Sequence, residues 1–190
     1  MSAPPPRPRA VVPNAVIGML AFLATETMFF AGLMSAFMIL KAGSMVWPPP
    51  DQPRLPAPVT AVNTAILLFS GFTVSRASGA IRRSSGTAAQ WLTYTLVLGT
   101  VFLVVQGSEW LRLLAHGLTV GGGNYAGVFY TLVGSHALHV LGGVLFLAVV
   151  AYNTRGGRYS ASHFGAISAA QLYWYFIILV WIVLYVVVYQ

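Results

Sequence analysis

The sequence predicts an all-α fold, a bundle of five transmembrane helices, from three observations. Of its 190 residues, 57% are hydrophobic and 7% are charged, whereas soluble domains carry about 25% charged residues. The apolar residues fall into five runs, each long enough to cross about 30 Å of hydrocarbon as a helix. The breaks between the runs are rich in proline, glycine or arginine, which end helices or mark their exits from a membrane.

The first apolar run predicts a span over residues 14–40, preceded by a proline-rich tail at residues 1–13. The tail has the composition of an extended polyproline segment. The run after it is too long for the hydrophobic region of a signal peptide, so no cleaved leader is expected. Lys41 follows the span and can extend to the far membrane surface. Residues 14–190 are predicted to form one transmembrane domain.

A second proline-rich segment, residues 47–58, separates the first two spans and excludes a helix or an inner strand there. Its Trp47 is placed to anchor the chain at the membrane interface. The second span is predicted over residues 59–79. It contains Asn63, a polar side chain that is expected to hydrogen-bond across helices.

The third span is predicted over residues 88–116, a length that indicates a tilted or projecting helix. Gln106 lies inside it and is also expected to hydrogen-bond to a neighbouring helix. Glu109 and Arg112 are three residues apart, so their side chains share one helix face. A structural ion pair near an interface is favoured for Glu109 over a functional carboxylate.

A glycine-rich connector leads to the fourth span, predicted over residues 126–152, and a basic loop leads to the fifth, predicted over residues 166–189. The fifth span contains Trp174 and Trp181. Together with Arg112 and Trp47, these residues are expected to act as interface anchors, because Trp gathers where a membrane meets water.

Basic residues favour one orientation of this domain. Ten lysines and arginines stand against three acidic residues, a net charge of +7. They lie between apolar runs rather than along one face, which favours a topological role over a nucleic-acid partner. Seven of them fall on the side of the N-terminus: Arg7, Arg9, Arg76, Arg82, Arg83, Arg155 and Arg158. The positive-inside rule then places the N-terminus inside and the C-terminus outside.

Few groups in the sequence carry chemistry. The absence of cysteine excludes disulfides and thiolate-bound metals, and no phosphate-binding loop or nucleophile motif is present, so no catalytic residue is predicted. His136 and His139 are three residues apart on one face of the fourth span. Such a pair can hold a metal or a haem iron, but no second pair lies on another span. Structural hydrogen bonding is therefore favoured, and no metal site is predicted.

Glu26 is the most informative of these groups, because it interrupts the apolar first span. An unpaired carboxylate at membrane depth costs roughly 3 kcal/mol or more. Glu26 is therefore expected to be paired, protonated or turned toward a protein or water-filled interior. Two interpretations stay open: a role in proton, lipid or subunit contacts, which this large cost favours, and a hydrogen-bonded glutamate that serves packing alone.

Several separated motifs follow one another along the chain: Phe-Leu-Ala-Thr-Glu-Thr-Met-Phe-Phe-Ala-Gly-Leu at 22–33, Gln-Gly-Ser-Glu-Trp at 106–110, Gly-Ser-His-Ala-Leu-His at 134–139 and Gly-Arg-Tyr-Ser at 157–160. In this order they resemble subunit III of the haem-copper terminal oxidases, the cytochrome c oxidase type. Residue by residue, Glu26 matches the family's carbodiimide-reactive carboxylate, and Glu109 matches the acidic residue of its Q-x-S-E motif. His136 and His139 match two histidines that the family uses structurally.

The resemblance implies a non-catalytic integral subunit of a respiratory oxygen reductase in a bacterial plasma membrane. Such a subunit would support proton uptake and the stability of the active site in the complex. Such a complex reduces oxygen to water with electrons from cytochrome c and pumps protons. Haems and copper would lie in other subunits and none in this chain. Subunit I would be the main contact, with subunit II, other respiratory subunits and phospholipids as further partners. An accessory protein of a quinol oxidase or nitric oxide reductase, and a stand-alone haem-binding or proton-conducting protein, are the alternatives.

The chain departs from the family pattern in two respects. The family often has seven spans, and this sequence has room for five, as in a short bacterial form that lacks the first two. In the last span, Ser168, Tyr175 and Ile178 stand where the family usually has Glu, His and Asp. These replacements remove polar groups from one end of that span.

Overall fold

The computed structural model describes residues 13–46, 57–115, 123–160 and 164–189. Within them, five helices follow one another along the chain: α1 (Asn14–Ala42), α2 (Ala57–Arg82), α3 (Ala88–Ala115), α4 (Asn124–Arg155) and α5 (Gly165–Tyr189). All five are long and apolar enough to cross a membrane, and the described residues contain no β-sheet. The predicted all-α fold of five spans is confirmed, with each helix end within three residues of its predicted position. Residues 1–12 of the predicted tail and Trp47 lie outside the described residues.

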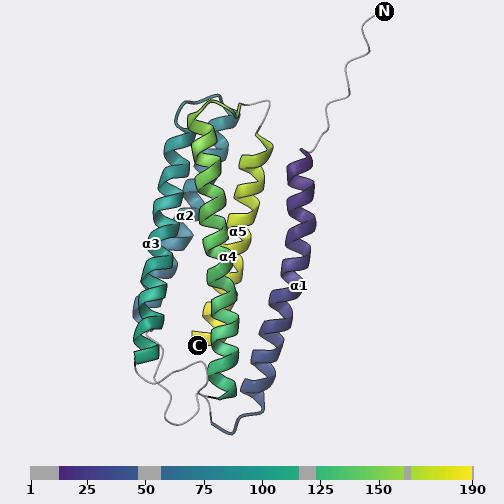
Figure 1. Cartoon of the computed structure of the whole chain (residues 1–190), viewed down its shortest axis with the longest axis vertical. Coiled ribbons are helices and arrows are strands. Elements are labelled where there is room, and N and C mark those ends of the chain that lie inside the picture. Colours follow the sequence, from purple (N-terminus) through teal and green to yellow (C-terminus); the bar gives the residue numbers. More distant parts are fainter. Residues whose placement is uncertain (1–12, 47–56, 116–122, 161–163, 190) are drawn as a thin grey trace, which may run out of the picture.

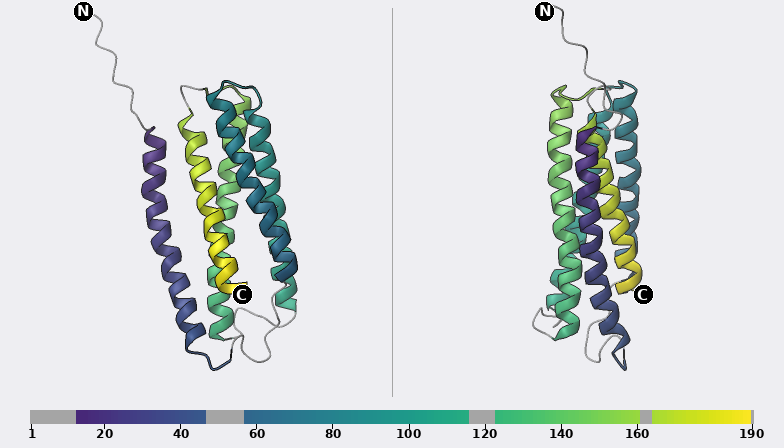
Figure 2. Two further views of the ribbon diagram at one scale, coloured as in Figure 1. Left: turned by 180° about the vertical axis from the view of Figure 1, so that it is seen from behind. Right: turned by 90° about the vertical axis from the view of Figure 1, so that its right-hand side faces the viewer.

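The helices form a group of four with a fifth helix beside it. α2, α3, α4 and α5 pack in a ring, each against the next, and α5 closes the ring against α2. α1 packs on the outside of this ring, against α4 and α5 (Figures 1 and 2). It runs parallel to α5 and antiparallel to α4 (Figure 1). One side of α1 is therefore directed away from the rest of the chain.

Trp174 of α5 occupies the centre of the four-helix ring and is fully buried. Its indole N–H donates to Oγ of Ser70 on α2, at 2.8 Å. A Cβ added at Gly99 of α3 would lie 2.5 Å from the Trp174 ring, and one added at Gly143 of α4 would lie 3.0 Å from it. Because these two residues lack a side chain, the indole fits between α3 and α4. A single side chain thus contacts each of the other three helices of the ring.

Trp181 occupies a similar position further along α5. It is fully buried, its indole N–H donates to Oγ1 of Thr64 on α2 at 2.9 Å, and its ring packs on Phe102 of α3 with ring centroids 4.9 Å apart. The sequence predicts positions at a membrane interface for Trp174 and Trp181, but both lie inside the bundle. They anchor helices to one another, because glycines and short hydroxyl side chains leave room for indoles there.

The α2–α3 and α4–α5 connections lie at the same end of the bundle (Figure 1). Helices α2 and α4 end there with the same backbone geometry, since Ser84 and Gly157 have left-handed φ angles of 52° and 70°. In each case the next N–H donates to a carbonyl five residues earlier, at 2.9 and 3.1 Å. These bonds satisfy carbonyl groups that a helix end leaves without partners.

Candidate functional site

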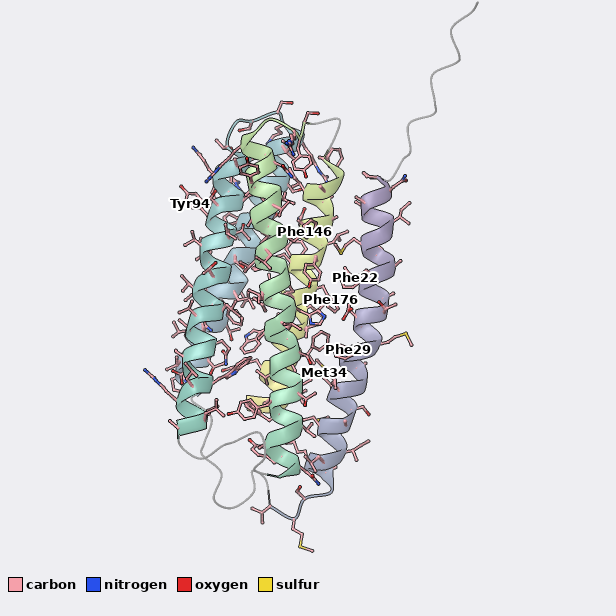
Figure 3. The ribbon with its side chains drawn as sticks, viewed as in Figure 1. Phe22, Phe29, Met34, Tyr94, Phe146 and Phe176 are labelled. Atoms are coloured by element: carbon pink, nitrogen blue, oxygen red, sulfur yellow. The ribbon has the colours of Figure 1, made fainter. Side chains whose placement is uncertain are left out.

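α1 contacts the rest of the chain along a narrow stripe of its surface. Phe30 and Phe37 are the two residues of α1 that are fully buried. Side chains that include Phe22 and Met34 of α1 and Phe176 of α5 fill the space between the ribbons (Figure 3). The remaining surface of α1 is exposed and mostly apolar. In a membrane, the hydrophobic effect does not drive such a helix onto its neighbours, because lipid surrounds its apolar side chains as favourably as protein does. α1 therefore needs specific contacts along this stripe.

Glu26 lies on this stripe and contacts α4. Its Oε2 is 2.8 Å from Nε2 of His139, and the two side chains are 18% and 16% exposed. The other ring nitrogen of His139, Nδ1, is 2.7 Å from the carbonyl oxygen of Ser135, one helical turn earlier. The carboxylate is therefore paired with another helix, which is one of the arrangements that the sequence predicts for it.

The hydrogen-bond partners of the two His139 ring nitrogens determine how many protons the Glu26–His139 pair carries. A carbonyl oxygen only accepts hydrogen bonds, so Nδ1 of His139 must carry a proton. Nε2 and Oε2 are then hydrogen-bonded only if one more proton lies between them, either on the imidazole or on the carboxyl group. The pair is an imidazolium with a carboxylate or an imidazole with a carboxylic acid. Either form holds one exchangeable proton between α1 and α4.

Aromatic side chains surround this pair. The rings of Phe29 and Phe30 lie 6.1 and 5.0 Å from the His139 ring, centroid to centroid. The hydroxyl group of Tyr173 on α5 donates to the backbone carbonyl of His139 at 3.1 Å. Because hydrogen bonds are stronger in surroundings of low polarity, this environment strengthens the contact between Glu26 and His139. The Tyr173 hydrogen bond also connects α5 to α4 next to this pair, so α1, α4 and α5 are joined at one point.

His136 has a different environment, although it is one turn away on α4. It is 1% exposed, its ring stacks on Trp181 with centroids 5.2 Å apart, and the edges of Phe30 and Phe102 complete its surroundings. Neither of its ring nitrogens has a hydrogen-bond partner in the described part of the chain. His136 thus packs as an aromatic ring, where the sequence favours a hydrogen-bonded histidine.

The two imidazoles do not form one ligand set. Both nitrogens of His139 are engaged, with Glu26 and with the Ser135 carbonyl, while His136 is enclosed by aromatic rings. Across the four described ranges, no three His, Asp or Glu side chains come together as metal ligands would. A metal on this pair would have to displace hydrogen bonds that hold two helices together.

The remaining polar residues singled out in the sequence lie on α2 and α3. Nδ2 of Asn63 donates to the Phe102 carbonyl at 3.0 Å and to Oε1 of Gln106 at 3.5 Å, so the predicted hydrogen bond between helices is present. Nη1 of Arg112 donates to Oε1 of Glu109 at 2.9 Å, which is the predicted ion pair. α1 packs against neither of these helices. Both features are therefore structurally separate from the Glu26–His139 pair.

The pairing of Glu26 with His139 is not among the predictions from the sequence. A signal for it exists: two polar groups that are costly in a membrane lie at comparable depth if the first and fourth spans are antiparallel. The roles of Ser70 and Thr64 as partners of buried indoles carry no such signal, because hydroxyl groups inside a helix usually bond to their own backbone.

Known proteins resemble this chain over almost its whole length. A family model described as cytochrome c oxidase subunit III matches residues 8–190. The chain belongs to the cytochrome c oxidase subunit III family. Cytochrome c oxidase subunit 3 of Synechocystis sp. is 38% identical over 92% of this chain and 74% of the relative. The protein of the same name from Thermostichus vulcanus is 34% identical over 92% and 86%, and the probable subunit 3 of Mycobacterium leprae is 32% identical over 93% and 88%.

Membership of the subunit III family makes the chain part of a haem-copper oxidase complex, where it is associated with other oxidase subunits in a membrane that it crosses several times.

The three replacements in the last span lie in two environments. Ser168 and Ile178 are buried, at 8% exposure each. Tyr175 is 39% exposed, and its hydroxyl oxygen accepts a bond from Nε2 of Gln171 at 3.1 Å.

Proposed function

We propose that this chain is a non-catalytic subunit of a cytochrome c oxidase, that it packs on subunit I, binds phospholipid and supports proton uptake. The observation that carries this proposal is the contact between Glu26 and His139, at 2.8 Å. This contact holds one exchangeable proton at membrane depth, and ionisable groups at such depth usually serve proton or ion movement. Haems and copper would reside in the neighbouring subunits.

Other features support the remaining parts of the proposal. The outer side of α1 exposes large apolar side chains, among them Met28 at 77% and Ile39 at 70%, which suits contact with a neighbouring subunit or with acyl chains. The basic connections lie at the end where α1 begins (Figure 1). By the positive-inside rule we place that end in the cytoplasm. The bacterial plasma membrane is proposed from the resemblance to the short, five-span bacterial form of the family.

Purification of the complex from native membranes, with an affinity tag on this chain, tests the proposal. We expect a haem-copper subunit to co-purify, a haem signal in the reduced-minus-oxidised spectrum, and oxygen uptake driven by reduced cytochrome c. Recovery of the chain without a haem-copper subunit would contradict the proposal. Oxygen uptake with a quinol but not with cytochrome c would contradict the assigned electron donor.

Glu26→Gln is expected to leave assembly intact and the initial oxygen uptake within about twofold of the wild type, a change below 0.5 kcal/mol in barrier height. A glutamine amide can donate to Nε2 of the neutral His139 ring, so the link between the helices persists without an exchangeable proton. The initial rate of the purified complex, measured with an oxygen electrode, checks this. An assembled complex without any oxidase activity would show that Glu26 does more than support turnover.

A hydrophobic carbodiimide is expected to label Glu26, because these reagents react with protonated carboxyl groups in apolar surroundings and the pair can place its proton on the carboxyl group. Glu109, which is ion-paired to Arg112 at 2.9 Å, serves as an internal control. Mass spectrometry of the labelled full chain checks the result. Labelling of Glu109 in preference to Glu26 would argue against a protonated carboxyl group in the pair.

A further inference from the structure

α2 and α3 form the side of the four-helix ring that lies away from α1, since α1 packs against α4 and α5 (Figure 2). A groove of about 350 Å³ lies between α2 and α3 on this side. Its walls are five apolar residues and one amide: Pro58, Val59, Val62, Ile66, Val105 and Asn63. Val59 and Val62 are 39% and 66% exposed, so the groove is open on the outer surface. Apolar side chains of a neighbouring molecule can fill it.

An arginine and aromatic side chains continue this surface toward the other end of α2. Val62, Phe69 and Arg76 are spaced seven residues apart, so they share one face of the helix. The guanidinium group of Arg76 lies over two rings, with its Cζ 5.9 Å from the centroid of Phe72 and 5.3 Å from that of Trp91. Phe69 stacks on Phe72, and both are more than half exposed. The α2–α3 face is defined as these five residues together with the groove.

Arg76 is a charged residue without a charged partner. Within the described residues it forms no hydrogen bond or ion pair, and both glutamates of those residues are paired with other groups. Arg76 lies inside the span predicted over residues 59–79. Phe72 precedes it by one turn, so the guanidinium group over that ring is turned toward the middle of the helix rather than toward its end. Arginines at membrane depth almost always pair with another group.

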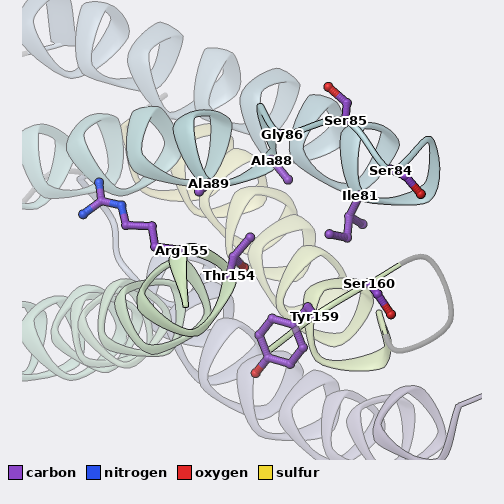
Figure 4. Close-up of a pocket in the computed structure, with 10 residues that line it drawn as sticks. All are labelled: Ile81, Ser84, Ser85, Gly86, Ala88, Ala89, Thr154, Arg155, Tyr159 and Ser160. Carbon is purple, nitrogen blue, oxygen red and sulfur yellow. The ribbon is translucent and has the colours of Figure 1, made fainter. Parts of the chain in front are cut away.

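The polar cavity at this end of the bundle is a separate feature. It encloses about 340 Å³ between the α2–α3 turn and the segment after α4 (Figure 4). Ser84, Ser85 and Ser160 are among its lining residues, so its walls suit water rather than the apolar side chains of a helix. Arg76 does not line it. The occupant of the α2–α3 face must therefore fit the groove and Arg76.

The spacing along α2 indicates what kind of molecule covers this face. Val62 in the groove and Arg76 are 14 positions apart (76 − 62), which is about 21 Å along a helix. A single lipid lies in one leaflet, about half of the roughly 30 Å of hydrocarbon. It cannot both bind Arg76 through its phosphate group and fill the groove in the other leaflet. A helix that crosses the membrane passes both features.

We propose that the α2–α3 face binds a transmembrane helix of another oxidase subunit, with apolar side chains in the groove and a carboxylate on Arg76. A guanidinium group and a carboxylate form two parallel hydrogen bonds, which meets the need of Arg76 for a partner. Arginine and aromatic residues also contribute most of the binding energy at many protein interfaces. The inference rests on the proposed place of this chain in an oxidase complex and does not depend on a role in proton uptake.

Photocrosslinking in the full complex tests which molecule covers this face. Benzoyl-phenylalanine replaces Val62 or Phe69 in the tagged chain, and the membranes are irradiated before purification. We expect both positions to crosslink to the same oxidase subunit, identified by mass spectrometry. Leu138, which is 69% exposed on α4, is the control position and is expected not to crosslink to that subunit. Crosslinks to lipid alone at Val62 and Phe69, or equal crosslinking at Leu138, would overturn the proposal. A haem-copper subunit that still co-purifies would then leave the proposed function standing.

Arg76→Gln is expected to make this chain leave the purified complex about tenfold faster, because loss of one charge-assisted hydrogen bond changes affinity by about this factor, mainly through the dissociation rate. Arg83→Gln is the matched control. It removes the same charge at the same end of the bundle, and in the described residues the Arg83 guanidinium group lies over no aromatic ring. Native mass spectrometry of the complex, followed over time in detergent, measures both rates.

Arg76→Lys is expected to fall between the wild type and Arg76→Gln, because lysine keeps the charge but lacks the planar fork of donors. Equal rates for Arg76→Gln and Arg83→Gln would overturn the proposal. If delipidation speeds the loss of the wild-type chain but not that of Arg76→Gln, the ligand of Arg76 is a lipid phosphate, and the proposed helix contact is overturned.

Discussion

Gly99→Ala is expected to destabilise the folded bundle by about 2 kcal/mol, although alanine favours a helix over glycine by about 1 kcal/mol. The added Cβ would lie 2.5 and 2.7 Å from two carbons of the Trp174 ring. That ring is fully buried, bonds to Ser70 at 2.8 Å and has Gly143 on its other side. It has no space to move into, so α5 must shift away from α3. The shift loosens the packing of Trp174 against α3 at the centre of the four-helix ring.

Gly107→Ala provides the matched control on the same helix. A Cβ at Gly107 meets no atom within 4 Å, so only the gain in helix propensity is expected, up to about 1 kcal/mol. Unfolding of the full chain in detergent micelles with increasing dodecyl sulfate, followed by circular dichroism, measures both variants. Equal unfolding midpoints for the two alanine variants would show that Trp174 adapts and that the close approach at Gly99 is not needed.

The helices are predictable from the sequence because their signals are local. The length of each apolar run and the breaks rich in proline, glycine and arginine place every helix end within three residues. The largest differences are at the ends of α2 and α4, which continue three residues beyond the predicted ends, to Arg82 and Arg155. Arginine in the last turn of a helix interacts favourably with the helix dipole, so these residues stay helical although they mark the exit from the apolar run.

The interior of the bundle is less predictable, since it depends on how helices rotate about their axes. Trp174 and Trp181 follow the composition of an aromatic belt at a membrane surface, yet both are fully buried. The space for Trp174 comes from Gly99 and Gly143, which belong to two other helices. Hydropathy does not encode which face of one span meets which residue of another, and glycine in a span predicts close packing without naming the partner.

The Glu26–His139 site is less predictable from the sequence than the helix ends and more predictable than the packing of the interior. The cost of a carboxylate in a membrane predicts that Glu26 needs a partner or a proton, and this is a local inference. The identity of the partner is not local, because His139 is 113 residues away in the sequence. It depends on the antiparallel packing of α1 and α4 and on the rotation of both helices. Sequence reasoning thus identifies the residue that requires an explanation, and the structure supplies the second half of the pair.

His139→Phe is expected to loosen α1 from the bundle by about 2 kcal/mol. This is less than the roughly 3–5 kcal/mol that removal of one partner of a fully buried pair costs, because the Glu26 side chain is 18% exposed. Phenylalanine retains the aromatic volume next to Phe29 and Phe30 but offers no hydrogen bond to Oε2. Glu26→Gln is the control, since its amide group can still donate to Nε2 of His139. The distance between α1 and α5 can be measured with spin labels on Ala24→Cys and Leu179→Cys. Both positions are exposed, and the chain has no other cysteine that would be labelled.

The double variant Glu26→Leu/His139→Phe separates two reasons for the effect of His139→Phe. If the damage arises from an unpaired carboxylate, removal of both polar groups should restore the distance distribution of the wild type and bring stability to within about 1 kcal/mol of it, because well-packed apolar residues often replace a buried polar pair without loss. We expect this recovery, since Phe30 and Phe37 still bury α1 against its neighbours. A double variant as loose as His139→Phe alone would show instead that the hydrogen bond itself holds α1 in place, and that apolar packing along the stripe is too weak to do so.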